Sequence, residues 1–527
     1  MTREPDDAPS ASSGGRGGAA TRVGVGIFLS RISGFISHRL FAHFFGSSDV
    51  ADAWRAALRM PNVLQNLLGE GTLSASMIPV YAEFLEQGRD EDARRFAGAA
   101  LGILAAVAGA LVLTGWLLAP ILVGVVFSQW GPEKQELVIR LVRILLPMTG
   151  ILVLFAWALG ILNSHRRFFV SYSASVLWNL AMITAMVAGG VYFGLGEVEL
   201  VIALAWGALV GGVAQFAVTL PFLLRPLGGL RISLGRGVDG VAEAIRNFTP
   251  VLAARGVVNL SSWLDMFIAG FLATGALAVV GYAQTFYLLP ISLFGMSVAA
   301  SELPELSRMR TEGYEAITDR VRTALRRVWF FLIPSAVVYL ALGDVVVAAL
   351  FETGSFGETQ TLITWGVLAA YSLGLPASAS SRVLSSAFYA FRDTRTPARI
   401  AYLRVVVSTV VGVAAMIPAD TLGFQRLHLG AAGLALGASV GAWLEYVLLR
   451  RALGQVAGPH GPGPRPVLML TLAASLAAAT GVAVQVLAPA ANPVVTALET
   501  LIPFGVVFFA VALAAGEDPG LRRASRG

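Results

Sequence analysis

Nine arginines lie inside long apolar segments or at their ends, where a charged side chain is unfavourable. These arginines are Arg31, Arg39, Arg55, Arg59, Arg140, Arg143, Arg255, Arg382 and Arg404. Arg31 lies about 14 Å along its segment if that segment is a helix rising 1.5 Å per residue. A charge at that depth costs about 3 kcal/mol or more and usually faces a water-filled cavity. The cluster in the first two segments predicts a wet, cationic central cavity; the alternative is a set of internal salt bridges to Asp52, Glu70 or Asp265.

The composition indicates the class of protein that must position these arginines. The chain has 527 residues, of which 56% are hydrophobic and 13% are charged. Soluble domains carry about 45–50% apolar and about 25% charged residues. We therefore predict an all-α polytopic membrane protein. Its net charge of +6 is typical of cytoplasmic loops attracted to anionic lipid and does not indicate a nucleic-acid partner.

The sequence offers little for catalysis or metal binding. It contains no cysteine, which excludes a disulfide scaffold, a cysteine-ligated metal site and a cysteine nucleophile. The five histidines are scattered along the chain: His38, His43, His165, His428 and His460. No Walker-type phosphate loop is present, so we do not expect ATP hydrolysis. We predict no catalytic residue, no metal site and no cofactor; the alternative of a membrane enzyme acting on lipid phosphates would need clustered carboxylates or histidines at a membrane face.

Fourteen apolar segments, each long enough to span a membrane, follow one another along the chain. They cover residues 22–45, 50–85, 96–127, 137–162, 168–194, 199–224, 246–274, 277–304, 325–350, 360–390, 397–418, 428–449, 466–489 and 493–516. With the N-terminus inside, 27 of the 38 basic residues fall in inside loops, and the outside loops hold only Lys134 and Arg426. Because basic loops remain on the cytoplasmic side, this alternation predicts fourteen spans with both termini cytoplasmic.

A faint internal repeat divides the spans into two halves. Gly46 precedes Pro61 by 15 residues, and Gly275 precedes Pro290 by the same 15. Each glycine marks an outside turn, the second of them at residues 273–275. The offset between the copies covers six spans, so both copies have the same orientation and are related by an axis along the membrane normal. We predict a disordered tail at 1–21, two pseudo-symmetric six-helix lobes at 22–225 and 226–455, two C-terminal helices within 456–516, and a cytoplasmic tail at 517–527.

The second apolar segment is too long for one straight span. Its 37 residues from Val50 to Glu86 would form a helix of about 55 Å, well beyond a hydrocarbon core of about 30 Å. Pro61 removes a backbone donor, and the run Gly69-Glu70-Gly71 offers a break with a carboxylate inside it. We predict either a break at the glycines or a plain kink in a tilted helix.

Several motifs resemble those of the MurJ (MviN-type) lipid II flippases, within the MOP exporter superfamily, over about residues 22–450. They are Ser30-Arg31-Ile32-Ser33-Gly34-Phe35, Ala51-Asp52-Ala53, Pro61-Asn62-Val63-Leu64, the long run from Gly69 to Phe84, Asn163-Ser164, Phe351-Glu352 with Gly354-Ser355-Phe356, and Phe388-Tyr389-Ala390 with Asp393-Thr394-Arg395-Thr396-Pro397. The resemblance implies two six-helix lobes plus two C-terminal helices that form a groove for a polyprenyl tail.

The resemblance also implies which residues bind the substrate. Arg31 and Asp52 match functional positions of the family, Glu70 lies in the matched Glu-Gly motif, and Asp265 matches an acidic position linked to a bound cation or proton. Charged residues usual in the family are replaced here by Ser37, Gln65, Thr285 and Leu288. Arg39, Arg55, Arg59 and Arg255 are expected to substitute for them, because a pyrophosphate needs cationic donors in the cavity rather than on one particular helix.

The expected activity is therefore transport and not catalysis. The resemblance implies that the chain flips lipid II, a polyprenyl-pyrophosphate-linked peptidoglycan precursor, from the inner to the outer leaflet of the bacterial cytoplasmic membrane by alternating access. Expected partners are that precursor, membrane lipids and the cell-wall synthesis machinery. The alternatives are a cation-coupled exporter of another polyprenyl-linked glycan or of drugs on the same scaffold, and a scaffold protein that does not transport.

Overall fold

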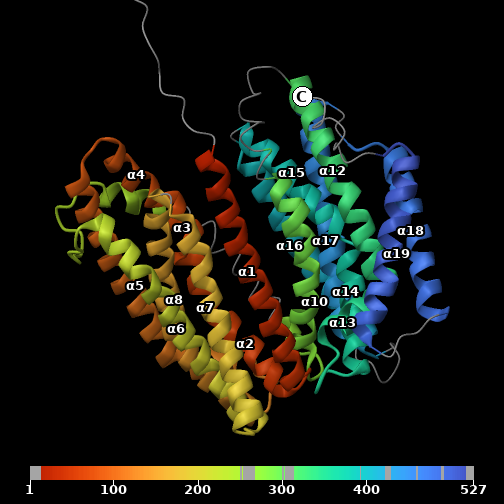
Figure 1. Cartoon of the computed structure of the whole chain (residues 1–527), viewed down its shortest axis with the longest axis horizontal. Coiled ribbons are helices and arrows are strands. Elements are labelled where there is room, and N and C mark those ends of the chain that lie inside the picture. Colours follow the sequence, from red (N-terminus) through yellow and green to blue (C-terminus); the bar gives the residue numbers. More distant parts are fainter. Residues whose placement is uncertain are drawn as a thin grey trace, which may run out of the picture. The chain divides into compact units, whose positions relative to one another are not determined.

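The computed structural model describes residues 14–165, 167–249, 252, 267–299, 302, 314–391, 393–421, 429–458, 461–487 and 492–517. These residues form an all-helical chain (Figure 1). They pack into two compact units: unit 1 comprises residues 1–41 and 56–260, and unit 2 comprises residues 42–55 and 261–527. The two predicted lobes are defined by the sequence repeat, whereas the two units are defined by packing. The units therefore do not test the predicted lobe boundaries, which stay a prediction.

Unit 1 holds most of the helices that precede residue 228. They are α1 (Gly14–Phe45), α2 (Asp49–Leu68), α3 (Glu70–Ser76), α4 (Ile78–Glu86), α5 (Asp90–Val126), α6 (Pro132–Ser164), α7 (Phe168–Val187), the π-helical turn η1 (Ala188–Tyr192) and α8 (Glu197–Leu227). Three acidic residues begin α5 and Pro132 begins α6, as the helix dipole and the fixed φ of proline favour. Buried Tyr81, Phe96 and Trp157 lie in the core that joins α4, α5 and α6.

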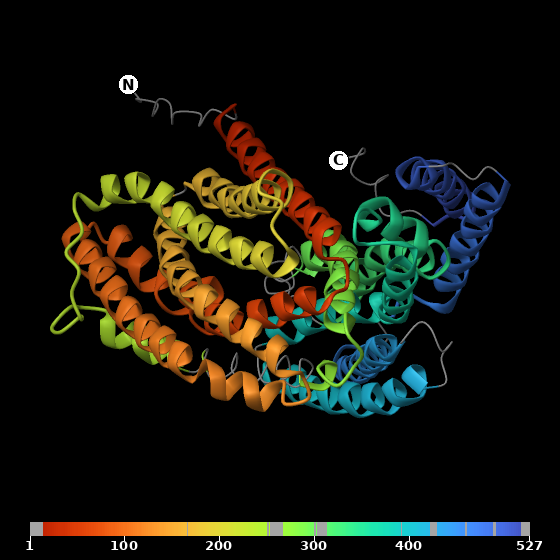
Figure 2. The ribbon, with the colours of Figure 1, turned by 90° about the horizontal axis from the view of Figure 1, so that it is seen from below.

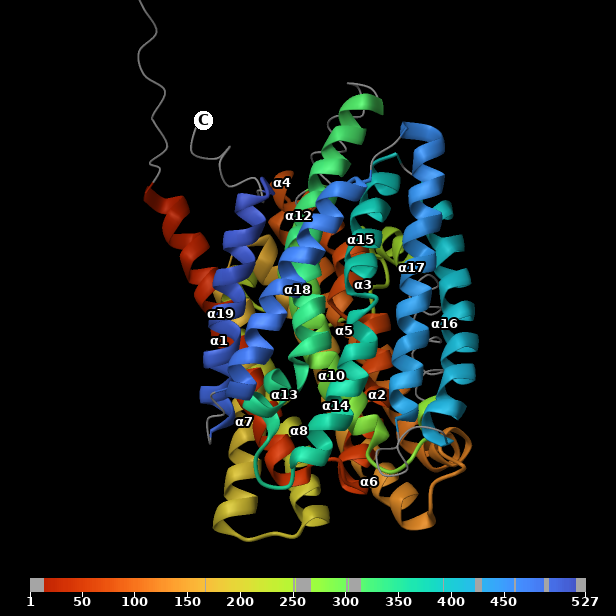
Figure 3. The same cartoon turned by 90° about the vertical axis from the view of Figure 1, so that its right-hand side faces the viewer.

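Unit 2 holds the remaining helices together with the tip of the α1–α2 hairpin. They are α10 (Ala276–Pro290), the π-helical turn η2 (Ile291–Met296), α12 (Tyr314–Ala341), α13 (Gly343–Phe351), α14 (Glu358–Ser372), α15 (Leu375–Ala390), α16 (Arg395–Thr421), α17 (Gly430–Ala457), α18 (Pro464–Leu487) and α19 (Pro493–Ala514). Figure 3 shows α16 beside α17 and α18 beside α19.

The all-α membrane fold is confirmed. Among the described residues, ten helices are long and apolar enough to cross a membrane, or eleven if α14 and α15, bent by 41° at their junction, form one span. Thirteen of the fourteen predicted spans coincide with described helices, and most of the span at 246–274 lies outside the described residues. The count of fourteen itself is not confirmed.

The long second segment is broken at the predicted glycines. Helix α2 continues through Pro61 and ends at Leu68, and Gly69 then takes an extended conformation (φ −82°, ψ −164°) before α3 begins. A Cβ at Gly69 would lie only 2.1 Å from the carbonyl oxygen of Gln65, so the chain can turn there only without a side chain. A second break at Met77 separates α3 from α4.

Two glycines on α5 receive an extended segment of the chain. Residues 229–240 leave α8 and lie beside α5 (Figure 2). A Cβ on Gly98 would lie 2.0 Å from the carbonyl oxygen of Arg231, and a Cβ on Gly102 would lie 2.1 Å from that of Ser233. The Ser233 N–H also donates to the Gly98 carbonyl at 3.4 Å. The missing side chains therefore let this segment pack directly on the helix backbone.

Helices α16 and α17 interlock through glycines in the same way. A Cβ on Gly437 would lie 2.4 Å from the backbone of Gly412, and a Cβ on Gly441 would lie 1.9 Å from the Ser408 hydroxyl. Such small residues let two helix backbones approach closely inside a membrane. Only 6% of the most apolar stretch of α16 is buried, and among the described helices α17 supplies most of its packing.

The contact between α5 and residues 229–240 can be tested with two alanine substitutions on one helix. Gly98→Ala should lower the free energy of unfolding by about 1–3 kcal/mol, because its methyl group overlaps the Arg231 carbonyl. Gly109→Ala is the matched control, since nothing lies within 4 Å of that position, and it should leave stability unchanged or raise it by up to about 1 kcal/mol. Thermal unfolding in detergent measures both, and equal shifts would contradict the packing described.

Candidate functional site

The carboxylate of Asp52 caps the N-terminus of α10. Its Oδ2 accepts a hydrogen bond from the Gly275 N–H at 2.7 Å, and its Oδ1 accepts one from the Ala278 N–H at 2.9 Å. Asp52 is only 2% exposed, so its charge is removed from water and must be compensated. The two N–H donors and the positive end of the helix dipole provide that compensation. The aspartate predicted to bind substrate therefore has both oxygens engaged by the protein backbone.

The two turns equated by the internal repeat lie against each other within unit 2. Gly46 (φ 50°) and Gly275 (φ 86°) both occupy the left-handed region that glycine tolerates. A Cβ on Gly275 would lie 2.2 Å from the Ser47 carbonyl oxygen, so this approach also excludes a side chain. The turn predicted at residues 273–275 is confirmed, and both repeat glycines are needed at this junction.

A third loop, residues 353–356, completes the junction. The Ser355 N–H donates to the His43 carbonyl at 2.8 Å, and His43 Nδ1 lies 2.9 Å from the Thr353 hydroxyl. Gly354 (φ 56°) allows this approach, because a Cβ there would lie 2.4 Å from the His43 carbonyl oxygen. We call residues 43–52, 274–278 and 353–356 the turn cluster.

Tyr282 joins the turn cluster to Arg55. Its hydroxyl donates to the Gly46 carbonyl at 2.8 Å, and its ring packs against Phe351 and Phe356 with centroids 5.0 and 5.2 Å away. The Arg55 guanidinium carbon lies 5.1 Å from the centre of the Tyr282 ring, a cation–π geometry worth about 0.5–2 kcal/mol. Arg55, predicted to bind substrate, is thus half-buried against α10.

Tyr282 is the residue of this junction that the sequence did not identify. It lies more than 200 positions from Arg55 along the chain, and no periodicity links residues that far apart. The available signal was Gly281, where a Cβ would lie 2.8 Å from the Arg55 side chain. A glycine inside a membrane helix next to an aromatic residue is too common to identify such a contact in one sequence.

Arg31 has a different environment, on the part of α1 that belongs to unit 1. Its side chain is exposed, and it lies fourteen residues before the helix ends at Phe45, about 21 Å along the axis. The Asn179 side chain on α7 donates to the Ser30 carbonyl at 3.3 Å and to the Ser33 hydroxyl at 3.0 Å. Ser30 and Ser33 share a helix face that excludes Arg31, so this contact fixes the direction in which Arg31 points.

The other predicted site residues divide into those that the structure describes and those that it does not. Arg39 on α1 and Arg59 on α2 are each half-buried. Arg255, Asp265 and the side chain of Glu70 lie outside the described residues. Within the described part of the chain, no group of three His, Asp or Glu side chains is placed to hold a metal ion.

Four positions at which the family usually has a charged residue carry uncharged side chains in this chain. Ser37 is buried, Gln65 is half-buried and Leu288 is exposed. The Thr285 hydroxyl donates to the Gly281 carbonyl of its own helix at 3.0 Å. Between residues 28 and 68 of the hairpin, the arginines are therefore Arg31, Arg39, Arg55 and Arg59, as predicted from the sequence.

Asp393 caps α16 in a loop outside the membrane-spanning segments. Its Oδ1 accepts hydrogen bonds from the Arg395 and Thr396 N–H groups, each at 3.0 Å. The hydrogen bonds from the Thr396 side chain and backbone, aided by the charge of Arg395, hold the pKa of Asp393 below its usual range. The motif that resembles the family at 393–397 is thus a helix start.

The role of Asp52 can be separated from that of its neighbour Asp49. Asp52→Ala removes the cap of α10 and should lower stability by about 1–3 kcal/mol, since two buried N–H groups lose a charged acceptor. Amide hydrogen exchange at residues 275–279 should accelerate. Asp49→Ala is the matched control, because Asp49 is an exposed acidic residue in the same turn of α2 and accepts a hydrogen bond from the Thr274 side chain, at 3.2 Å. Equal exchange rates in the two variants would contradict the cap.

The Asp393 cap predicts a pH dependence of stability. The pKa of Asp393 is lower in the folded than in the unfolded protein. The contribution of Asp393 to stability is therefore fully present above its unfolded pKa of about 3.9 and is lost as the pH falls through its folded-state pKa. Asp393→Ala should cost about 1 kcal/mol at neutral pH, and its difference from wild type should shrink below about pH 4. Asp393→Asn keeps an uncharged acceptor and should cost less at neutral pH, and its difference from wild type should shrink over the same range because it also lacks the titrating carboxylate. Unfolding temperatures measured across this pH range distinguish the three proteins.

Comparison with known proteins places this arrangement in one family. The sequence model described as lipid II flippase MurJ matches residues 41–511. The chain is 31% identical over 432 residues to a probable lipid II flippase MurJ of Rhizobium tropici, covering 81% of this chain and 79% of that protein. It is also 31% identical over 446 residues to the lipid II flippase MurJ of Burkholderia cenocepacia, covering 83% of each.

Solved structures show the same fold. A lipid II flippase MurJ in an inward closed conformation superposes with a TM-score of 0.74 at 22% identity, covering 93% of this chain and 97% of that one. An inward-facing multidrug resistance MATE family transporter of the MOP superfamily gives a TM-score of 0.64 at 16% identity, covering 83% and 98%. The resemblance found in the sequence motifs is confirmed, and this chain belongs to the MurJ family of lipid II flippases.

Proposed function

We propose that this chain flips lipid II, a polyprenyl-pyrophosphate-linked peptidoglycan precursor, from the inner to the outer leaflet of the bacterial cytoplasmic membrane. The observation that carries the proposal is the family match over residues 41–511, which extends through both compact units. The activity is transport by alternating access through a cationic central cavity, and both termini lie in the cytoplasm.

Arg31 supports the cationic part of this proposal. An exposed guanidinium within a membrane helix is stable only if it faces water, a counter-ion or a headgroup. The planar guanidinium binds phosphate oxygens through two parallel hydrogen bonds, which suits a pyrophosphate. Arg31 and Arg59 are the residues that we assign first to the headgroup, together with Arg39, Arg55 and Arg255. Glu70 lies in the same family motif, and Asp52 supports the site by holding α10.

The amphiphilic substrate suits such a cavity. Its sugar pyrophosphate head cannot cross about 30 Å of hydrocarbon unaided, whereas its polyprenyl tail never has to leave the hydrocarbon. The head would therefore pass through the wet cavity while the tail stays in lipid beside the protein, in the groove expected at α18 and α19.

Release on the outer side requires a second conformation with weaker contacts, and some energy source must favour that conformation. Asp265 is the proposed site for a coupling monovalent cation or proton. The turn cluster lies on the predicted outer side, so we assign it to the outer closure of the cavity. Opening would then break the hydrogen bonds that Asp52 and Tyr282 make with neighbouring backbone. Cell-wall synthesis enzymes are the proposed consumers of the released precursor.

A second candidate is a cation-coupled exporter of another polyprenyl-linked glycan or of drugs. The TM-score of 0.64 to a multidrug resistance MATE family transporter shows a shared fold, and this shared fold is the observation that favours the second candidate. The hairpin arginines favour an anionic substrate over the cationic or neutral molecules that an acidic or aromatic cavity would bind.

Rescue of a cell depleted of its own lipid II flippase tests the proposal. Wild type should restore growth and the fraction of lipid II that an externally added lipid II-cleaving enzyme can reach. Arg31→Ala and Arg59→Ala should each lower that fraction about tenfold, since a lost hydrogen bond to a charged group corresponds to at least that factor.

Arg140→Ala is the matched control, because Arg140 is also an exposed arginine on a membrane helix but is not assigned to the headgroup. It should rescue as wild type does. If wild type inserts into the membrane and fails to rescue, lipid II is not the substrate. If wild type rescues and both hairpin variants rescue equally well, the cavity assignment is wrong.

A further inference from the structure

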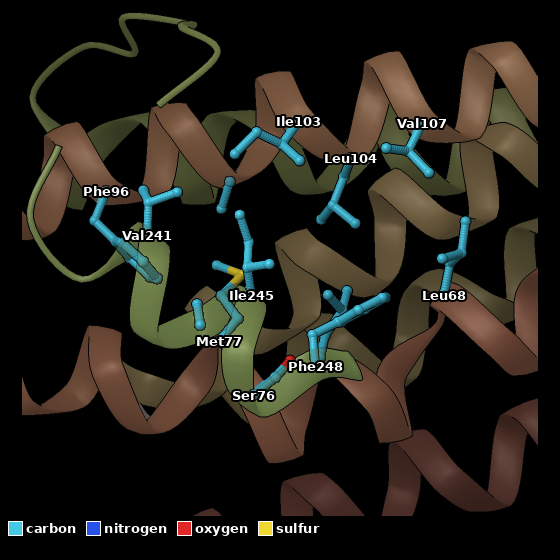
Figure 4. Close-up of a pocket in the computed structure, with 13 residues that line it drawn as sticks. Leu68, Ser76, Met77, Phe96, Ile103, Leu104, Val107, Val241, Ile245 and Phe248 are labelled. Atoms are coloured by element: carbon cyan, nitrogen blue, oxygen red, sulfur yellow. The ribbon is translucent and has the colours of Figure 1, made fainter. Parts of the chain in front are cut away.

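Unit 1 contains an apolar cavity that the transport mechanism does not use. It measures about 110 Å³ and lies between α3, α5 and the helix formed by residues 241–249. Figure 4 shows Phe96, Ile103, Leu104 and Val107 extending from α5 toward Ile245 on the opposite helix. All of its lining residues belong to unit 1.

The cavity has nothing to hold water. Among the described lining residues, Ser76 alone has a polar side chain, and the Ser76 hydroxyl already donates to the Thr72 carbonyl at 2.8 Å. An engineered apolar cavity of about 150 Å³ stays dry and binds benzene. A site of this size and lining therefore accepts a small hydrocarbon group and disfavours a polar one.

The cavity also reaches the surface of the protein. The lining residues Val107 and Ile245 are 42% and 52% exposed. Ile232 and Leu234 are also exposed, on the segment that lies over Gly98 and Gly102. In a membrane-spanning chain, such apolar side chains face lipid, so a lipid chain can enter the cavity from the bilayer.

Basic side chains lie on the segment that packs beside the cavity. Gly235 lies against two lining residues, because a Cβ there would be 3.1 Å from both Ile103 and Val241. The adjoining Arg236, and Arg231 on the same segment, are exposed. Neither forms an ion pair with any carboxylate in the described part of the chain. They remain available for an anionic headgroup at the membrane surface.

We propose that this cavity binds the end of one acyl chain of an anionic phospholipid, with Arg231 and Arg236 contacting its phosphate. The lipid belongs to the leaflet beside residues 86–95 and 228–240, which is the inner leaflet in the proposed orientation. A bound chain would fill the space between α5 and the 241–249 helix and stabilise the packing of residues 229–249 on unit 1. This site is separate from the lipid II pathway and does not depend on it.

The cavity fits a phospholipid better than the polyprenyl chain of the proposed substrate. An acyl chain is unbranched and its end is narrow, whereas a polyprenyl chain carries a methyl branch at every fourth carbon of its backbone. The basic segment also lies beside the cavity, so one lipid can satisfy the charge and the cavity together.

Photo-crosslinking tests the site directly. The probe is phosphatidylglycerol with a diazirine near the end of one acyl chain, added to the purified full-length chain in phosphatidylcholine nanodiscs. Labelled peptides should come from α5 and residues 241–249. Ala244→Trp fills the cavity and should lower labelling about tenfold, since each excluded methylene accounts for about fourfold in affinity.

Ala242→Trp is the matched control, because Ala242 lies on the exposed side of the same helix, and its labelling should equal that of wild type. If Ala244→Trp does not fold, as judged by gel filtration, Ala100→Leu fills the cavity from α5 instead. The double variant Arg231→Gln, Arg236→Gln should abolish the preference for phosphatidylglycerol over a phosphatidylcholine probe, a preference of about fivefold per contacting arginine.

Three results would overturn the proposal. The first is equal labelling of the Ala242→Trp and Ala244→Trp proteins, and the second is labelling of wild type away from α5 and residues 241–249. The third is displacement of the probe by undecaprenyl pyrophosphate at lower concentration than by unlabelled phosphatidylglycerol, which would assign the cavity to the substrate tail. None of these readouts requires transport, so failure here is distinguishable from failure of the proposed function.

Discussion

The contact between the Asp52 carboxylate and the start of α10 organises much of unit 2. A carboxylate that is 2% exposed needs donors for its oxygens, and the N–H groups of Gly275 and Ala278 are oriented to supply them. Once this bond forms, Gly46 must meet Tyr282, and Arg55 must lie over the Tyr282 ring. The tip of the α1–α2 hairpin thereby packs with unit 2, while its two stems pack with unit 1. One hairpin therefore contributes residues to both compact units of a chain that is proposed to change conformation.

The charged residues of this hairpin differ in what surrounds them. Asp52 is buried and bonded to backbone, and Arg55 is half-buried on an aromatic ring. Arg31, in contrast, is exposed although Asn179 holds the adjacent serines of its helix in place. A buried, satisfied charge stabilises one conformation, whereas an exposed charge in a rigid position is available to a ligand. This contrast supports our proposal that Arg31 contacts the substrate.

The sequence predicted what depends on local pattern and composition. Apolar segments and basic loops predicted a polytopic helical protein. The run Gly69-Glu70-Gly71 left a break or a plain kink open, and the structure shows the break. The repeat of Gly46 and Gly275 predicted two turns, but not that they touch, because contacts such as that of Tyr282 with Gly46 join residues 236 positions apart. Likewise, Asp52 and Arg55 are both charged residues in an apolar segment. Only the fold distinguishes a helix cap and a ring contact from a ligand-binding group.

The close pairing of α16 and α17 has a consequence for how the protein is made. These helices are neighbours in the chain, and their glycines at 412, 437 and 441 let the two backbones meet. Because α16 has little other packing within the described part of the chain, we expect its stability to depend on the helix that is synthesised immediately after it. The pair is therefore expected to enter the membrane as a preformed hairpin during translation, before α18 and α19 have left the ribosome.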